Sequence, residues 1–99
     1  MVQNLSQFKR AMKDGQCFEI LEHYIHPEFA GQIRKPNYVQ TNAFYTVIPG
    51  EPESWISKAN NGRGFYLEYG KAKDWSFADD GTITMALRGN PVMKIRMIA

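Results

Sequence analysis

Residues 75–97, WSFADDGTITMALRGNPVMKIRM, decide the fold, because apolar and polar side chains alternate on either side of two turn signals. The first signal is Asp-Asp-Gly at 79–81, and the second is Gly-Asn-Pro at 89–91. The apolar positions that share one face in the middle and last segments are Ile83, Met85, Leu87, Met93, Ile95 and Met97. Alternation of this kind around Asp-Gly turns predicts two consecutive β-hairpins.

Further strands are predicted upstream. Residues 65–69 alternate in the same way, and residues 43–48 are rich in β-branched and aromatic side chains. Residues 49–53 and 60–64 are rich in the Pro, Gly and Asn typical of loops. Between them only 54–59 has strand character, through Trp55 and Ile56.

Two other segments are less regular. The apolar residues of 17–25 change face midway, which predicts a bulge or burial on both sides. Pro36 interrupts residues 33–40, so this part is predicted to be an edge strand or a bend. Thr41 and Asn42 fit a turn before 43–48, although the two runs could also form one long bent strand.

One helix is predicted, over residues 4–14. Its apolar face consists of Leu5, Phe8, Ala11 and Met12. Asn4 can accept hydrogen bonds from the first turn, and Gln7 three residues later completes a reciprocal capping pattern. Gly15 tolerates the left-handed conformation of a C-terminal cap and ends the helix.

Together these elements predict an α+β fold that is mostly β, in a single domain over residues 1–99. We expect the N-terminal helix to pack on a curled antiparallel sheet, or on a small SH3-like barrel, of five to seven short strands. The aromatic residues expected to face inward are Phe8, Phe18, Phe44, Phe65, Trp75 and Phe77.

The composition is that of an ordinary globular chain. Its 99 residues are 43% hydrophobic, 13% aromatic and 22% charged, which excludes the disordered, collagen-like and coiled-coil classes. Twelve Lys and Arg against ten Asp and Glu leave a net charge of +2. That excess is too small to identify a nucleic-acid-binding protein by itself.

A single cysteine, Cys17, excludes an intrachain disulfide and a four-thiolate zinc site. Residues 1–15 contain charged side chains and lack the apolar run of a signal peptide. No stretch approaches the roughly 18 apolar residues that a membrane-spanning helix needs. We therefore expect a protein of the reducing cytoplasm with no membrane partner.

No pattern in the sequence predicts an enzyme, a metal site or a cofactor. Cys17, His23 and His26 lie close together, but their spacing is not that of zinc ligands, and nothing places an oxyanion donor beside a Cys–His pair. A buried packing thiol and two imidazoles near the surface are the better interpretation. The paired carboxylates, Glu51 with Glu53 and Asp79 with Asp80, fall in turn-forming sequence, where they serve solubility and turn chemistry.

Two motif comparisons fail. Asn-Gly-Arg-Gly at 61–64 precedes a strand, whereas phosphate-binding glycine loops precede a helix or carry a Lys followed by Ser or Thr. Residues 63–69, Arg-Gly-Phe-Tyr-Leu-Glu-Tyr, approach the signature of RNA-recognition motifs but lack one position between the aromatics. A slip of one residue moves a side chain to the other face of a strand, so the stacking surface would be lost.

Basic residues leave nucleic-acid binding open, because small barrels bind single strands through aromatics framed by cations. The exposed aromatics expected to serve this role are Tyr38, Tyr45 and Trp55, although Trp55 could equally be a core residue. The residues expected to contact nucleic acid or a protein partner are Lys9, Arg10, Lys13, Arg34, Lys35, Trp55, Arg63, Lys71 and Lys73. The alternative without a binding function is that these cations only keep the surface solvated.

The order of four short motifs resembles small uncharacterised accessory proteins of phages, prophages and conjugative elements of Gram-positive bacteria. The motifs are LSQFKRAMKDG at 5–15, VQTNAF at 39–44, YGKAKDW at 69–75 and DGTIT at 80–84. Gly70 stands where the usual pattern has Pro, and residues 49–63 are a longer insertion. The resemblance implies a mobile-element accessory protein and assigns no functional residues.

We therefore expect a small non-catalytic protein that binds another protein. Its size, the resemblance and the lack of a catalytic motif favour this function. A small nucleic-acid-binding barrel is the alternative, and it depends on the basic residues.

Overall fold

The computed structural model describes residues 1–50 and 65–98, and this part of the chain contains one α-helix and seven β-strands. The elements in chain order are α1 (Leu5–Lys13), β1 (Phe18–His23), β2 (Ile33–Val39), β3 (Ala43–Val47), β4 (Phe65–Glu68), β5 (Trp75–Phe77), β6 (Thr82–Leu87) and β7 (Asn90–Met97). Short 3-10 helices at Pro27–Phe29 and Ala72–Asp74 follow β1 and β4. The strand predicted at 54–59 lies outside the described residues.

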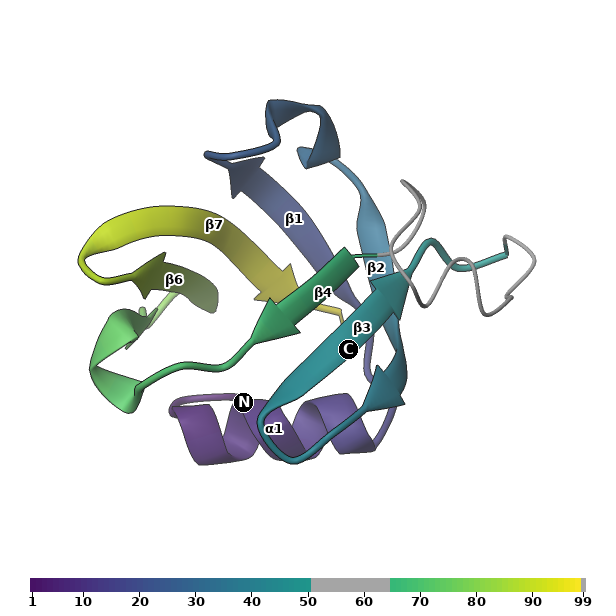
Figure 1. The fold of residues 1–99 in the computed structure, drawn as a ribbon, viewed down its shortest axis with the longest axis horizontal. Coiled ribbons are helices and arrows are strands. Elements are labelled where there is room, and N and C mark those ends of the chain that lie inside the picture. Colours follow the sequence, from purple (N-terminus) through teal and green to yellow (C-terminus); the bar gives the residue numbers. More distant parts are fainter. Residues whose placement is uncertain (51–64, 99) are drawn as a thin grey trace.

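The strands form one antiparallel sheet in the order β4-β3-β2-β1-β7-β6-β5. The sheet curls, and α1 lies across one end of the curl (Figure 1). In the described ranges no ladder joins β4 to β5, although only residues 69–74 separate these two edge strands. The curled sheet under an N-terminal helix is therefore confirmed, and a closed SH3-like barrel is not formed.

The ends of α1 follow the predicted signals closely. The Asn4 side chain accepts a hydrogen bond from the backbone N–H of Gln7 at 2.9 Å. The side chain of Gln7 accepts from the N–H of Gln3 instead of Asn4, so the reciprocal bond is displaced by one residue. At the other end Gly15 has a φ of 79°, and the N–H groups of Gly15 and Gln16 donate to carbonyls of the last helical turn. This pair of hydrogen bonds forms a Schellman cap.

Phe8 is the centre of the hydrophobic core. Its ring is fully buried and lies 4.8 Å from Trp75, 5.9 Å from Phe44, and just over 6 Å from Phe18 and Tyr69, measured between centroids. Phe8 therefore joins α1 to the strands around it. Of the six aromatics predicted to face inward, Phe8, Phe18, Phe44 and Trp75 are buried and Phe77 is half-buried against the core. The side chain of Phe65 is not among those described.

Bulges explain the irregular segments. The register between β1 and β7 shifts between Ile20 and Glu22, which is the change of face seen in the sequence. Pro36 is in the part of β2 that pairs with β3 alone, because the ladder between β1 and β2 covers only Ile33 and Arg34, so the edge prediction holds for this part of the strand. A register shift next to Pro36 shows that the predicted bend is correct. β2 and β3 are separate antiparallel strands, so the single long strand is also excluded.

The two C-terminal hairpins are confirmed, with one shifted turn. The Asp79–Gly81 turn is closed by a hydrogen bond from the Gly81 N–H to the Ala78 carbonyl, and Gly81 has a φ of 90°. The second turn is at Arg88 and Gly89, which both have positive φ, rather than at residues 89–91. Two consecutive positive φ angles match the right-handed twist of a hairpin. Asn90 and Pro91 consequently belong to β7.

Candidate functional site

The structure separates the cations that the sequence grouped as possible contacts. Arg34 is fully buried, so its assignment as a surface contact is wrong. Its guanidinium donates to Oε1 of Gln32 from Nε at 3.0 Å and from Nη2 at 2.6 Å, and it lies 4.9 Å from the Phe29 ring centroid. The alternation of β2 places Arg34 on the inner face and Lys35 on the outer face. Arg34 is a structural residue.

Lys35, Lys71 and Lys73 are exposed. They belong to elements that are distant in sequence from the cations on α1. Lys35 is on β2, and the other two flank and occupy the short helix before β5. Trp55 and Arg63 lie outside the described residues. The three remaining cations, Lys9, Arg10 and Lys13, do come together.

These three cations line a cleft of about 390 Å³ between α1 and the turn that joins β2 to β3. The other lining residues are Ser6, Val39, Gln40, Thr41 and Tyr69. Spacings of three and four residues put Ser6, Lys9, Arg10 and Lys13 along one side of the helix. We call this set of residues the cationic cleft.

Tyr69 forms the floor of the cationic cleft. Its ring is 2% exposed and packs against Phe44, and the ammonium of Lys9 lies 5.0 Å from its centroid. Burial raises the pKa of Tyr69 to about 12, so the phenol stays neutral at ordinary pH. Its hydroxyl has no hydrogen-bond partner among the described residues. The ring holds Lys9 in place without contributing a negative charge.

A second recess, of about 400 Å³, lies on the open side of the curled sheet. Leu67 of β4, Met85 of β6 and Val92 of β7 line its walls, while Ile25, Tyr66 and Leu87 surround it. Its polar lining comes from His23, His26 and Glu68, and Phe29 completes it. We call this set of residues the apolar recess. The mouth of the recess exposes large apolar side chains to solvent, since Ile25 is 60% exposed, Leu87 49% and Tyr66 40%.

Three tyrosines cross the outer face of β2, β3 and β4 next to this recess. Tyr38 stacks on Tyr45 with ring centroids 5.6 Å apart, and Tyr45 lies 4.9 Å from Tyr66. Tyr66 belongs to both the row and the recess, so the aromatic surface and the recess are continuous. Sequence reasoning identified Tyr38 and Tyr45 as surface aromatics but missed Tyr66, whose partners are visible only once the strands are paired.

The histidines and the cysteine do not form a catalytic or metal-binding group. Cys17 is half-buried before the start of β1, whereas His23 ends that strand, so six residues at about 3.3 Å each place them roughly 20 Å apart. His23 is buried, and its Nδ1 accepts the N–H of His26 at 2.9 Å. His26 lies 3.4 Å from a carboxylate oxygen of Glu28. Among residues 1–50 and 65–98, no cluster of three acidic, His or Cys side chains could hold a metal.

His23 makes stability depend on pH. Burial lowers the pKa of His23 below its usual 6.5, His26 and Arg34 lower it further, and Glu28 opposes them. The folded protein therefore holds His23 neutral, so its contribution is complete above about pH 6.5 and is lost as the pH falls through the lower folded-state pKa. We expect the Tm to drop between pH 7.5 and 5.5, which thermal unfolding followed by circular dichroism would measure.

The matched control for this prediction is His23→Asn, which keeps an acceptor near the His26 N–H but does not titrate. Its Tm is expected to vary less over the same pH interval. An equal loss of Tm in both proteins would show that another group controls the acid dependence.

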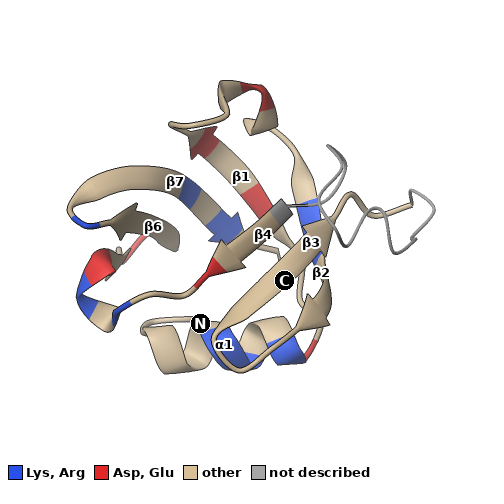
Figure 2. Cartoon of the chain, viewed as in Figure 1, with Lys and Arg blue, Asp and Glu red and all other residues tan. Residues whose placement is uncertain are grey.

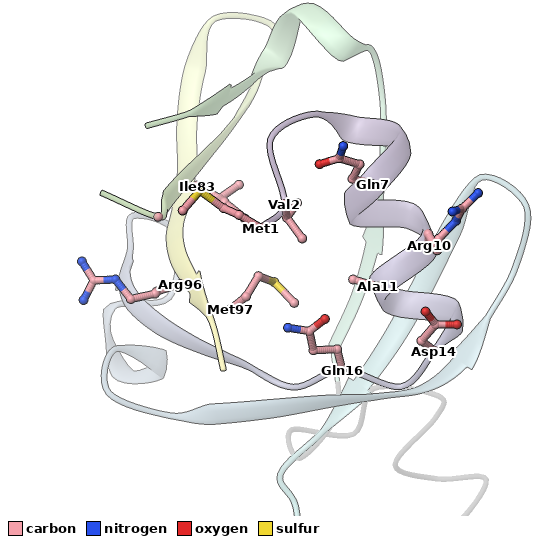
Figure 3. A pocket seen from close by; sticks show the side chains of 11 residues that line it. Met1, Val2, Gln7, Arg10, Ala11, Asp14, Gln16, Ile83, Arg96 and Met97 are labelled. Atoms are coloured by element: carbon pink, nitrogen blue, oxygen red, sulfur yellow. The ribbon is translucent and has the colours of Figure 1, made fainter. Parts of the chain in front are cut away.

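A third space, of about 520 Å³, lies between α1 and the strands β6 and β7 (Figure 3). Its lining mixes Met1, Val2 and Met97 with Arg10, Asp14 and other polar groups, and the guanidinium of Arg96 points away from it. Gln16 already donates to the carbonyl of Ile98 at 3.0 Å. With charges of both signs and no converging polar set, this space is a poor candidate for a site.

In the described part of the chain, no helix has the length and apolar character required to cross a membrane. Comparison with protein-family models, with curated proteins and with solved structures gave no match.

Proposed function

We propose that this protein is a non-catalytic binding protein that docks another protein on the apolar recess. The observation that carries the proposal is the clustering of Ile25, Tyr66 and Leu87, all at least 40% exposed, around one concave surface. Isolated exposed apolar residues are normal on a folded protein, but a group around a recess is typical of an interaction site.

The chemistry of the recess suits an apolar side chain of the partner. Its walls are aliphatic, and its few polar groups, such as Glu68 and His26, are where an interface would have its polar rim. The adjoining row of Tyr38, Tyr45 and Tyr66 adds the residue type in which binding energy is often concentrated.

The paired carboxylates, which were the remaining candidates for acid–base catalysis, are also consistent with a non-enzymatic role. Asp80 accepts a hydrogen bond from the Thr82 N–H at 2.9 Å, and this bond is the main cause of its lowered pKa. It therefore closes a turn and is not poised as an acid or base. Glu51 and Glu53 are outside the described residues. In keeping with a lone cysteine and the resemblance to mobile-element proteins, we place the protein in a bacterial cytoplasm as an accessory protein of such an element.

The test is a nuclease-treated pull-down from a Gram-positive host lysate with Ile25→Asp, Leu87→Asp and the control Ile33→Asp. Ile33 is 45% exposed and is not part of the recess lining, so Ile25 and Ile33 are matched in type and similar in exposure. A charge in the recess should remove a discrete protein band that the wild type and Ile33→Asp both retain. We expect at least about a tenfold loss of affinity, since a buried unpaired charge costs more than 1.4 kcal/mol.

Folding of each variant is checked by its thermal transition before the pull-down. Retention of the band by Ile25→Asp and Leu87→Asp, or no band with the wild type, would contradict docking on the recess.

A further inference from the structure

The whole net positive charge of the chain is located on α1. Of 12 Lys and Arg and 10 Asp and Glu, the helix and its C-cap residue contain three cations and one acid, Asp14. The other 89 residues therefore have nine charges of each sign and are neutral overall. Figure 2 shows the cations of α1 beside the turn between β2 and β3. The modest net charge of +2 thus conceals a strongly asymmetric distribution.

Among the described residues, no salt bridge involves a cation of the cleft. The contact of an acidic with a basic group found there, 3.4 Å between His26 and Glu28, is far along the chain from α1. No Asp or Glu is among the residues that line the cationic cleft. Asp14 is four residues after Arg10, and the two side chains lie beside each other at the end of the helix, where both line the space between α1 and β7 (Figure 3).

The helix dipole does not remove this positive potential. Cations near a helix C-terminus complement its partial negative charge, which is the ordinary structural reason for Arg10 and Lys13 in the last turn. That partial charge is about half an elementary charge. Three cations exceed it several-fold even after the single negative charge of Asp14 is subtracted, so positive charge remains available to a ligand. A structural role at the C-terminus explains Arg10 and Lys13 but not Lys9.

The neighbouring groups match those that contact phosphates. Ser6, Gln40 and Thr41 add two hydroxyls and an amide to the three cations, and such side chains, with Lys and Arg, make most protein contacts to nucleic-acid backbones. Arg10 and Lys13 are exposed, and the cluster is at the C-terminal half of the helix, away from its free N–H groups. An open row of cations of this kind suits a chain of phosphates better than one enclosed phosphate.

We propose that the cationic cleft binds the phosphate backbone of nucleic acid, with Lys9, Arg10 and Lys13 each contacting a phosphate. The Tyr69 ring holds the Lys9 ammonium at the cleft wall. This site is separate from the apolar recess, because the two share no lining residue. Binding is expected not to depend on base sequence, because the three cations contact phosphates, and phosphate contacts carry no sequence information.

The experiment is a fluorescence anisotropy titration with a labelled 20-nucleotide single strand and the corresponding duplex, at about 50 and 200 mM salt. Three phosphate contacts predict a slope of log K against log salt of about −2 for the single strand and about −3 for the duplex. Affinity should therefore fall about 20- to 40-fold between the two salt concentrations. The slope also tells whether single strands or duplexes engage all three cations.

The variant Lys9→Gln/Arg10→Gln/Lys13→Gln is compared with Lys35→Gln/Lys71→Gln/Lys73→Gln, which removes the same charge from exposed positions elsewhere. The helix variant should lose at least about tenfold in affinity and almost all of its salt slope, because each phosphate-contacting cation accounts for about one unit. The control variant should retain most of both. Equal losses in the two variants would overturn a local site in favour of overall charge.

Competition distinguishes the ligand class. Unlabelled oligonucleotide should displace the probe, whereas polyglutamate of similar charge and inorganic phosphate at matched ionic strength should not. Displacement by polyglutamate would overturn nucleic acid in favour of an acidic polypeptide, and displacement by inorganic phosphate would overturn a polynucleotide in favour of a single-phosphate site. No binding of either probe up to about 10⁻⁴ M protein, the weak limit of ordinary non-specific binding, would also overturn the proposal.

Discussion

Replacing Phe8 with alanine is expected to lower the free energy of unfolding by about 3–5 kcal/mol. The ring is fully buried and contacts four aromatic rings that belong to separate parts of the sheet. A cavity at this position cannot be filled by one neighbour, because α1 and the strands would all have to move inward. Domains of this size have roughly 5–15 kcal/mol of stability, so the variant should be near the limit of folding.

Urea unfolding followed by tryptophan fluorescence and circular dichroism measures this loss, and Phe77→Ala is the matched control. Phe77 is the same residue type in a half-buried position beside Trp75. Its removal should cost clearly less, since a partly exposed site leaves a smaller cavity. A denaturation midpoint for Phe8→Ala equal to that of Phe77→Ala would show that α1 is not docked through Phe8.

Arg34→Ala is expected to be the second large effect, with a loss of about 2–5 kcal/mol, the range for long buried side chains. The aliphatic part of Arg34 packs in the interior, and its guanidinium contacts Gln32 and the Phe29 ring. Truncation removes this packing as well as the charge. It also leaves Oε1 of Gln32 without the two hydrogen bonds it accepts.

Two further variants make the result specific. Arg34→Lys should lose about 1–3 kcal/mol, because an ammonium cannot reproduce the two-pronged contact with Gln32. Lys35→Ala, one residue further along the same strand and exposed, should change stability by less than about 0.5 kcal/mol. If Arg34→Ala were as stable as Lys35→Ala, Arg34 would not be a structural residue.

Local signals predicted the helix and the hairpins because their causes are local. Asn4 and Gly15 cap α1 through hydrogen bonds that span a few residues, and the Asp79–Gly81 turn depends on its own backbone. The shift of the second turn to Arg88 and Gly89 has a physical reason as well. Pro91 can occupy the start of β7, and positive φ at Gly89 gives the hairpin the twist that its strands require.

The parts that sequence patterns missed depend on contacts between distant segments. Arg34 is basic and flanked by Lys35, so composition suggests a surface residue, and only the face of β2 assigns it to the interior. Leu87 shares its strand face with Ile83 and Met85, yet it is exposed as the last residue of β6, beside the turn at Arg88 and Gly89. Closure of the barrel depends on the meeting of β4 and β5, which no local pattern encodes.

The candidate surfaces were predicted to different extents. Lys9, Arg10 and Lys13 were recognised because three- and four-residue spacing reports on a helix face. The apolar recess was not, because its residues come from four segments of the chain and only the curl of the sheet brings them together.

The pairing of β1 with β7 has a consequence for how the chain is made. Phe18 is paired with Met97, so 79 positions of sequence separate the two partners. At 5–20 residues per second a ribosome needs about 4–16 seconds to supply the second after the first. Throughout that interval the only strand partner of β1 within the described sheet is β2, through Phe18 and Glu19, and the edge of β1 that pairs with β7 remains open. The nascent protein therefore depends on late, non-local strand pairing, which makes folding slow and exposes it to aggregation and to chaperones until its last strand emerges.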